Sequence, residues 1–194
     1  MPQWDYSGNG VYFITLVTQN RECILGKIVG GGVISDGIQL SDFGKIVDTE
    51  WLKSFEIRDE LFLDEYIIMP NHLHAIVVLN NTDGANGMNG TDVETHGRAS
   101  LQSHEQSHKQ PPFRKPKSMS SFIAGFKSVI NSKIDDYIDQ HRLNIPKYNR
   151  NNHFFQPNYH DHIIRNNEEY QRIKNYIINN PLKWNEDKFN SFIK

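Results

Sequence analysis

Two histidines at alternate positions carry the clearest chemical signal in this sequence. His72 and His74 lie in the run MPNHLHAIV, separated by a single leucine. Successive side chains of a β-strand point to opposite faces, so both imidazoles would project from the same face. Two imidazoles at this spacing can hold one cation between them. A pair of histidines on a half-solvated strand face is the other interpretation that the pattern leaves open.

A second polar group lies near the end of the chain, just before Pro181. Tyr176 and Asn180 are four residues apart, so they share one face of a helix that extends this far. The amide oxygen of Asn180 could then bind the same metal, with Tyr176 beside it. Such a ligand set leaves positions open for water and phosphate oxygens, which favours Mg²⁺ or Mn²⁺ over a closed zinc site. Alternatively, Tyr176 is an ordinary aromatic of an amphipathic helix, flanked by Ile173 and Ile177.

The hydrophobic pattern predicts the elements that must position these residues. Alternation and β-branched content predict extended segments over residues 12–19, 61–69, 72–79 and 153–164. Helical spacing predicts helices from Ser41 or Asp42 to about 55, over 118–142 and over 167–179. Pro70-Asn71 suits a tight turn between two strands, and the glycines of residues 26–39 suggest a loose hairpin.

The order of these elements predicts an α+β fold. A ferredoxin-like antiparallel sheet with helices packed on one face accommodates them, and we expect residues 1–194 to form a single domain. Residues 80–117 contain almost no large apolar side chains, so we expect a flexible insertion there. We interpret its histidines as surface residues and not as metal ligands; they are His96, His104 and His108.

Composition narrows the class of protein. The mean hydropathy is −0.62, and no run of about 18 apolar residues predicts a membrane-spanning helix. A single cysteine, Cys23, excludes a disulfide framework and a cysteine-based zinc site. The first residues lack the basic and apolar regions of a secretory signal, so we expect a cytoplasmic protein without a membrane partner.

The charge of the chain is unevenly distributed. The formal net charge is −2, but residues 1–80 contain 5 basic and 11 acidic side chains, whereas residues 81–194 contain 16 and 12. Such an asymmetry can build a basic face on a nearly neutral protein, and therefore permits a nucleic-acid partner. A solvated, lysine-rich helix would also account for it.

These motifs together resemble those of a known family. Asn71-His72-Leu73-His74 is similar to the His-hydrophobic-His signature of the HUH single-strand endonucleases. More closely, the chain resembles the REP-associated tyrosine transposases and the one-tyrosine insertion-sequence transposases. The other matching pieces, in order, are Tyr12–Thr15, Phe126–Ser128, Tyr159–Asn166 and Tyr176–Pro181. The resemblance spans roughly residues 6–184, and residues 80–117 match poorly.

The resemblance implies an HUH endonuclease fold and a role for each motif residue. His72 and His74 would bind the metal, Mg²⁺ or Mn²⁺, with Asn180 as the third ligand, where many insertion-sequence relatives have glutamine. Tyr176 would be the nucleophile of an enzyme that cleaves and rejoins single-stranded DNA near hairpins through a 5′-phosphotyrosine. The sequence shows no unambiguous general base for Tyr176. Relatives act as monomers or as homodimers, and both states stay open.

The residues that would bind DNA are less clear from the sequence. We expect phosphate contacts from basic residues on the elements that carry the motifs, namely Lys127, Arg165, Arg172 and Lys174. Tyr159 or Phe155 could stack on an unpaired base. His162 could be catalytic, or could orient the last helix through a hydrogen bond.

Two functions from other classes are also compatible with the sequence. One is a domesticated nucleic-acid-binding module that uses the same sheet without chemistry. The other is a metal-dependent phosphodiesterase that uses water, and not a tyrosine, as the nucleophile.

Overall fold

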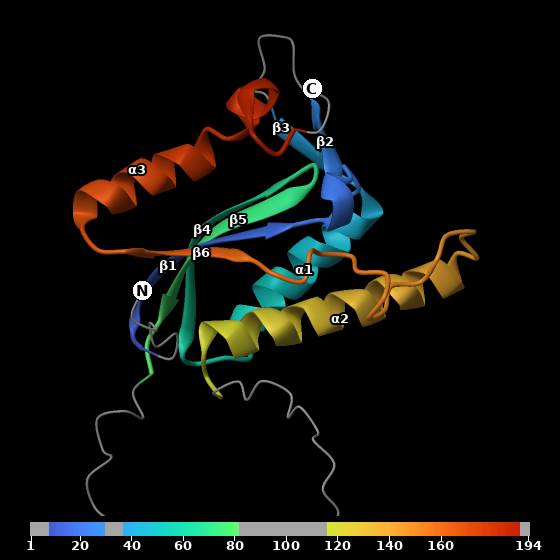
Figure 1. The fold of residues 1–194 in the computed structure, drawn as a ribbon, viewed down its shortest axis with the longest axis horizontal. Coiled ribbons are helices and arrows are strands. Elements are labelled where there is room, and N and C mark those ends of the chain that lie inside the picture. Colours follow the sequence, from blue (N-terminus) through green and yellow to red (C-terminus); the bar gives the residue numbers. More distant parts are fainter. Residues whose placement is uncertain (1–7, 30–36, 82–115, 191–194) are drawn as a thin grey trace, which may run out of the picture.

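The computed structural model describes residues 8–29, 37–81 and 116–190, and its centre is a four-stranded antiparallel sheet (Figure 1). The strands lie in the order β4-β5-β1-β6. Their bounds are β1 Gly10–Val17, β4 Leu61–Met69, β5 His72–Leu79 and β6 His160–Ile164. The expected insertion at 80–117, with its three histidines, falls almost wholly outside the described residues.

The chain passes through this sheet in β-α-β-β-α-β order, which is the ferredoxin-like arrangement expected from the sequence. Helix α1 (Asp42–Glu56) connects β1 to β4, and α2 (Met119–Gln140) connects β5 to β6. A small hairpin of β2 (Gly26–Val29) and β3 (Gly37–Leu40) lies between β1 and α1. The α+β fold class is therefore confirmed, and within the described residues no helix is long and apolar enough to span a membrane.

Local signals explain where the helices begin. The side chain of Ser41 accepts a hydrogen bond from the backbone N–H of Gly44, as expected of the N-cap of α1. Ser118 and Ser121 form a reciprocal capping box at the start of α2. Helix α3 (Asn167–Ile178) begins after Asn166, whose side chain accepts from the N–H of Glu169.

Helices α1 and α2 cover one face of the sheet with the larger core. Trp51 of α1 is fully buried, and its ring centroid lies 5.4 Å from that of Phe122 and 5.0 Å from that of Phe126, both on α2. The strand residues of this core alternate along β1 and β5: Tyr12, Ile14, Leu16, Leu73, Ala75, Val77 and Leu79. This periodicity of two is what the sheet requires, since each strand turns every second side chain toward the same face.

Helix α3 packs on the opposite face, so the expectation of helices on one face holds for α1 and α2 only (Figure 1). The physical reason is that β5 and β6 also carry apolar residues on this second face. Ile76 and Ile164 form a small buried cluster there with Ile173 and Ile177, which are four residues apart on α3. Element order alone does not decide which face a terminal helix covers.

Polar contacts with the edge strand β4 also hold α3 in place. The pairing of β4 with β5 shifts register between Leu63 and Tyr66, and Asp64 lies within this bulge. The hydroxyl of Tyr170 donates to Asp64 Oδ2 at 2.5 Å, and Lys174 Nζ donates to Asp64 Oδ1 at 2.9 Å. The bulge therefore directs a carboxylate toward two side chains that lie one turn apart on α3.

The last strand is shorter than expected. The sequence predicts an extended segment over 153–164, but only residues 160–164 form β6. Phe154 and Phe155 instead leave the sheet to pack in the larger core, and Phe155 makes an isolated bridge with Thr18. Pro157 follows them and has no N–H with which to continue a ladder.

The aromatic core gives a stability prediction. Phe126→Ala should lower the free energy of unfolding by about 3–5 kcal/mol, because it removes a 2%-exposed ring that packs on Trp51 and leaves a cavity. Val129→Ala, on the exposed side of the same helix, should change it by no more than about 0.5 kcal/mol. Urea unfolding measures both, and equal losses would contradict this packing.

Candidate functional site

The two histidines of β5 lie on the sheet face that α3 covers, and both are buried. His72 Nδ1 lies 2.9 Å from Asn71 Oδ1, and His74 Nδ1 lies 2.8 Å from the Thr15 hydroxyl oxygen. Since Asn71 Oδ1 can only accept, His72 donates through Nδ1 and keeps a lone pair on Nε2. The ring centroids are 4.4 Å apart. Nδ1 of each ring is thus held by a neighbour, and Nε2 of His72 has no hydrogen-bond partner within the described residues.

Tyr176 reaches this pair from the last turn of α3. Its hydroxyl lies 3.2 Å from His74 Nε2 and 3.5 Å from Asp187 Oδ2. The ring meets the edge of Phe13, which lies beside His74 on the same sheet face. Ile177, the next residue, is fully buried, whereas Tyr176 is 39% exposed. The helix therefore places the phenol at the boundary between the buried histidines and solvent.

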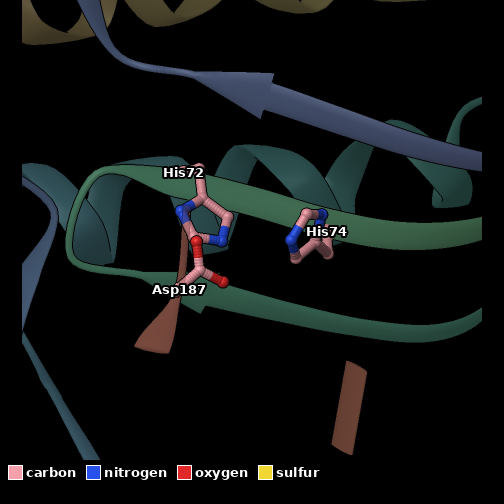
Figure 2. Close-up of side chains that lie close together, drawn as sticks. All are labelled: His72, His74 and Asp187. Atoms are coloured by element: carbon pink, nitrogen blue, oxygen red, sulfur yellow. The ribbon is translucent and has the colours of Figure 1, made fainter. Parts of the chain in front are cut away.

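Asp187 completes the cluster, although no sequence motif indicates it. After Asn180 the chain turns back through the 3₁₀ helix Pro181–Glu186. Ligand atoms of His72, His74 and Asp187 all lie within 4.8 Å of one another (Figure 2). The only sequence signal was an acidic residue shortly after a proline, which forces the chain to change direction and does not say where it goes.

Asn180, the third ligand implied by the family resemblance, lies beside this cluster. It is 1% exposed, and its Nδ2 donates to Asp187 Oδ2 at 3.3 Å. The backbone N–H of Phe189 donates to the other carboxylate oxygen of Asp187 at 2.6 Å. The structure therefore brings Asn180 and Asp187 to the two histidines together.

Burial determines the protonation states at this site. It lowers the pKa of His72 to about 4, against an opposing effect of Asp187. Burial, together with His72 and Lys188, lowers the pKa of His74 well below its usual range. Burial and the charge of Asp187 raise the pKa of Tyr176. At neutral pH the imidazoles are therefore neutral, with lone pairs available, and the tyrosine is a phenol.

Two buried atoms of the site indicate whether its residues suit a cation. His72 Nε2 and Asn180 Oδ1 have no hydrogen-bond partner, and a buried polar atom without one costs about 1–3 kcal/mol. Both atoms can offer an electron pair, as can the carboxylate of Asp187. Imidazole nitrogens with carboxylate and amide oxygens suit a divalent cation such as Mn²⁺ or Mg²⁺. The residues present fit such an ion, and His72, His74 and Asp187 could hold it.

An open cleft of about 840 Å³ lies along α3 and contains Tyr176. Its lining combines the site with cationic side chains that lie before and after Tyr176 in the chain. These are Arg172, Lys183 and Lys188. The sequence does not indicate the two lysines, because nothing in their spacing distinguishes them from other surface lysines.

His162 also lines this cleft and connects β6 to the start of α3. Its Nε2 donates to Glu169 Oε1 at 2.7 Å, and the backbone N–H of Arg165 donates to Glu169 Oε2 at 3.0 Å. These hydrogen bonds, first from Arg165 and then from His162, lower the pKa of Glu169. Of the two roles considered for His162, the structure provides the hydrogen bond that orients the helix.

The four basic residues expected to contact DNA occupy different surroundings. Arg172 lines the cleft and is exposed, and Arg165 is exposed at the link before α3. Lys174 pairs with Asp64, whose hydrogen bond raises the pKa of the lysine. Its ammonium group therefore fastens α3 to β4, and a phosphate contact by Lys174 stays a prediction.

Lys127 lies on α2, on the other side of the sheet from α3. Its ammonium group donates to the carbonyl oxygens of Gln156, Pro157 and Asn158, at 2.7, 3.1 and 3.1 Å. An ammonium group has three N–H donors, so these contacts occupy them all. Lys127 thus holds a loop in place. Phe155, considered for base stacking, is 3% exposed and belongs to the core.

Comparison with known proteins shows what the fold of this chain resembles. No family model matches the chain. An uncharacterized protein of Haemophilus influenzae is 28% identical over 191 residues, which cover 97% of this chain and 89% of that protein. A solved structure of the REP-associated tyrosine transposase bound to a REP hairpin has a TM-score of 0.54 and 16% identity, and the match covers 97% of this chain and 76% of that one.

The fold is that of the REP-associated tyrosine transposase. The suspected fold is thereby confirmed, and the likeness extends over nearly the whole chain. In this chain, strand β5 of the antiparallel sheet carries His72 and His74, and α3 carries Tyr176.

Metal binding gives a prediction for this site. Loss of a residue that supports a metal ligand by a hydrogen bond typically lowers metal affinity by roughly 10- to 100-fold. We expect His72→Ala, which removes a proposed ligand itself, to lower the affinity for Mn²⁺ by more than this. An equilibrium titration followed by the electron paramagnetic resonance of free Mn²⁺ measures the affinity. The matched control is His153→Ala, which changes a histidine in the cleft beside α2 and should leave the affinity unchanged. An equal effect of both substitutions would argue against a site on β5.

Proposed function

We propose that this protein is a metal-dependent tyrosine transposase that cleaves and rejoins single-stranded DNA near hairpins through a 5′-phosphotyrosine intermediate. The observation that carries the proposal is the position of the Tyr176 hydroxyl, 3.2 Å from His74 Nε2 and beside Asp187, in an open cleft. A potential nucleophile and a potential cation site thus meet where a flexible strand could reach them. The likeness of the fold to the REP-associated tyrosine transposase supports the same proposal.

The proposed metal ligands are His72, His74 and Asp187, with the unpaired oxygen of Asn180 as a further donor. This set modifies the expectation from the sequence, in which Asn180 alone completed the site. A bound Mg²⁺ or Mn²⁺ ion would polarise the scissile phosphate and stabilise the negative charge that develops on its oxygens.

The chain's own contribution to the reaction centres on Tyr176. Its phenol oxygen attacks the phosphorus, a tyrosine O–P bond forms, and the bond from phosphorus to the 3′ oxygen breaks. The phenol loses a proton and the departing 3′ oxygen gains one, so the step is a transesterification that consumes no water. Because the phosphodiester energy is retained in the protein–DNA bond, a 3′-hydroxyl can reverse the step and rejoin strands.

The pKa of Tyr176 explains why the surrounding residues matter. In the free protein, burial and Asp187 raise this pKa, so the hydroxyl is a poor nucleophile at neutral pH. His74 and Asp187 lie within hydrogen-bond distance and can orient the hydroxyl. Phe13 packs against the ring and limits its rotation.

The cleft favours a single strand as substrate. Arg172 lies one helical turn before Tyr176, and Lys183 and Lys188 follow it in the chain. Cationic side chains that line the same cleft as the nucleophile would contact phosphates near the scissile one. We therefore propose Arg172, Lys183 and Lys188 as phosphate contacts, with Arg165 as a further one at the start of α3. The hairpin is proposed from the REP hairpin bound by the structural neighbour.

Formation of a covalent adduct is the decisive test. We expect purified protein, incubated with a labelled hairpin oligonucleotide and Mn²⁺, to give an SDS-resistant protein–DNA species, and Tyr176→Phe to abolish it. The matched control is Tyr170→Phe, on the same helix, which loses only its hydroxyl contacts with Asp64 and Lys174 and should still form the adduct. Gel electrophoresis with a labelled 5′ or 3′ end shows which side of the break carries the protein.

The same assay separates the other two functions. Cleavage that survives Tyr176→Phe without an adduct would indicate a phosphodiesterase that uses water. DNA binding that is unaffected by chelator and by His72→Ala, without cleavage, would indicate a binding module. Either outcome would contradict the proposal.

Binding of single-stranded DNA tests the phosphate contacts separately from the chemistry. By fluorescence anisotropy in EDTA, we expect Arg172→Ala and Lys183→Ala each to weaken binding. Each should also reduce the slope of log affinity against log salt concentration by about 0.7, the value for one phosphate contact on a single strand. Lys133→Ala, which changes an exposed lysine on α2, is the control and should alter neither quantity. If all three variants have the same slope of log affinity against log salt concentration, the single-stranded DNA binds elsewhere on the protein.

A further inference from the structure

We propose that Asn71 is a positioning residue that couples the two histidines to the C-terminal segment carrying Asp187. The inference rests on the proposed metal site, since it concerns how two of its ligands are brought together. Asn71 lies in the turn between β4 and β5, and its side chain is completely buried.

The amide of Asn71 makes three hydrogen bonds in two directions. Its Nδ2 donates to the carbonyl oxygens of Arg21, at 3.0 Å, and Phe189, at 2.7 Å. Its Oδ1 accepts from Nδ1 of His72 at 2.9 Å. Carbonyl oxygens only accept, so the NH₂ group must face them and Oδ1 must face the imidazole. One amide therefore fixes the orientation of its neighbour's ring and also holds a distant part of the chain.

The contact with Phe189 determines where Asp187 lies. The backbone N–H of Phe189 donates to Asp187 Oδ1 at 2.6 Å, so the residue whose carbonyl is held by Asn71 also orients the carboxylate. The Phe189 ring lies 4.8 Å from that of His72 and is 5% exposed. The segment 187–189 is thus attached to the histidine strand through polar and apolar contacts at the same place.

Arg21 provides the other side of this attachment. Its guanidinium donates to the carbonyl oxygen of Lys188 at 3.0 Å and lies over the Phe189 ring. Asn20 and Arg21 both have positive φ, at 55° and 58°, a conformation that non-glycine residues rarely adopt. A backbone held in this conformation presents the Arg21 carbonyl to Asn71 and the side chain to Lys188.

Thr15 also contacts a histidine ring, but it differs from Asn71 in its other contacts. Its hydroxyl contacts His74 Nδ1 and so orients one ring, but within the described part of the chain it makes no hydrogen bond to residues 187–190. Asn71 orients His72 and also holds Asp187, so its loss should affect both ligands together. We therefore expect affinity for the cation to depend on whether segment 187–190 is docked.

Asn71→Asp is the sharpest variant. It keeps an oxygen for His72 Nδ1, but places a second oxygen against the carbonyls of Arg21 and Phe189, which repel it. We expect the Mn²⁺ affinity to fall by about 10- to 100-fold. In the metal-free protein, we also expect faster amide hydrogen exchange over residues 187–190. Exchange in β1 and α2 should stay unchanged, which shows that the variant is folded.

Two further variants separate the orientation of a histidine ring from the attachment of residues 187–190. Thr15→Val should lower the Mn²⁺ affinity while leaving exchange over 187–190 as in the wild type. Asn152→Asp is the matched control, because its amide donates to a single backbone carbonyl, that of Lys147, far from the site. It should change neither quantity. If Asn71→Asp does not fold, Asn71→Ser removes the same donors without adding a charge and is measured in the same way.

Each result of these measurements supports or contradicts the proposed role of Asn71. Unchanged affinity or unchanged exchange over 187–190 in the Asn71 variants would overturn the proposal, since it requires both to change. If the wild-type protein binds no Mn²⁺, the proposed function fails, and the exchange measurement alone decides whether Asn71 holds the segment. No DNA is present in these experiments, so failure of adduct formation is a separate result.

Discussion

The alternation of side chains along β5 is the constraint on which the rest of the structure depends. His72 and His74 point to one face, while Leu73 and Ala75 point into the larger core on the other. Pairing with β1 places Thr15 directly opposite His74. A slip of one residue in this register would exchange the two sets, burying imidazoles among aliphatic side chains and turning leucines toward the cleft. The large core therefore fixes the position of the polar site on the other face.

The two faces of the sheet are covered by very different amounts of apolar surface. Helices α1 and α2 share an extensive core, whereas α3 contributes two isoleucines to a small cluster of four and makes polar contacts with Asp64. The helix that carries Tyr176 is thus the least extensively buried of the three. The larger share of the buried apolar side chains therefore lies on the face opposite the cleft.

The sequence predicted the parts of the site that follow from local periodicity. Alternation placed His72 and His74 on one face. Helical spacing would place Tyr176 and Asn180 on one face only of a helix that reaches residue 180, whereas α3 ends at Ile178 and Asn180 precedes a 3₁₀ helix. The sequence could not predict Asp187, because a reversal through a 3₁₀ helix has no periodic pattern. Nor could it show that Lys127 and Lys174 are occupied, because their acceptors lie in distant parts of the chain. The face covered by α3 depended in the same way on tertiary packing.

The bulge in β4 has a consequence for the protein in solution. Strand β4 forms one edge of the sheet, and an exposed, regular edge is a template on which another chain can add a strand. The interruption between Leu63 and Tyr66 breaks the regular spacing of free backbone groups, and it places two carboxylates, Asp64 and Glu65, beside them. The irregularity that anchors α3 therefore also makes the β4 edge a poorer template for pairing with a strand of another chain.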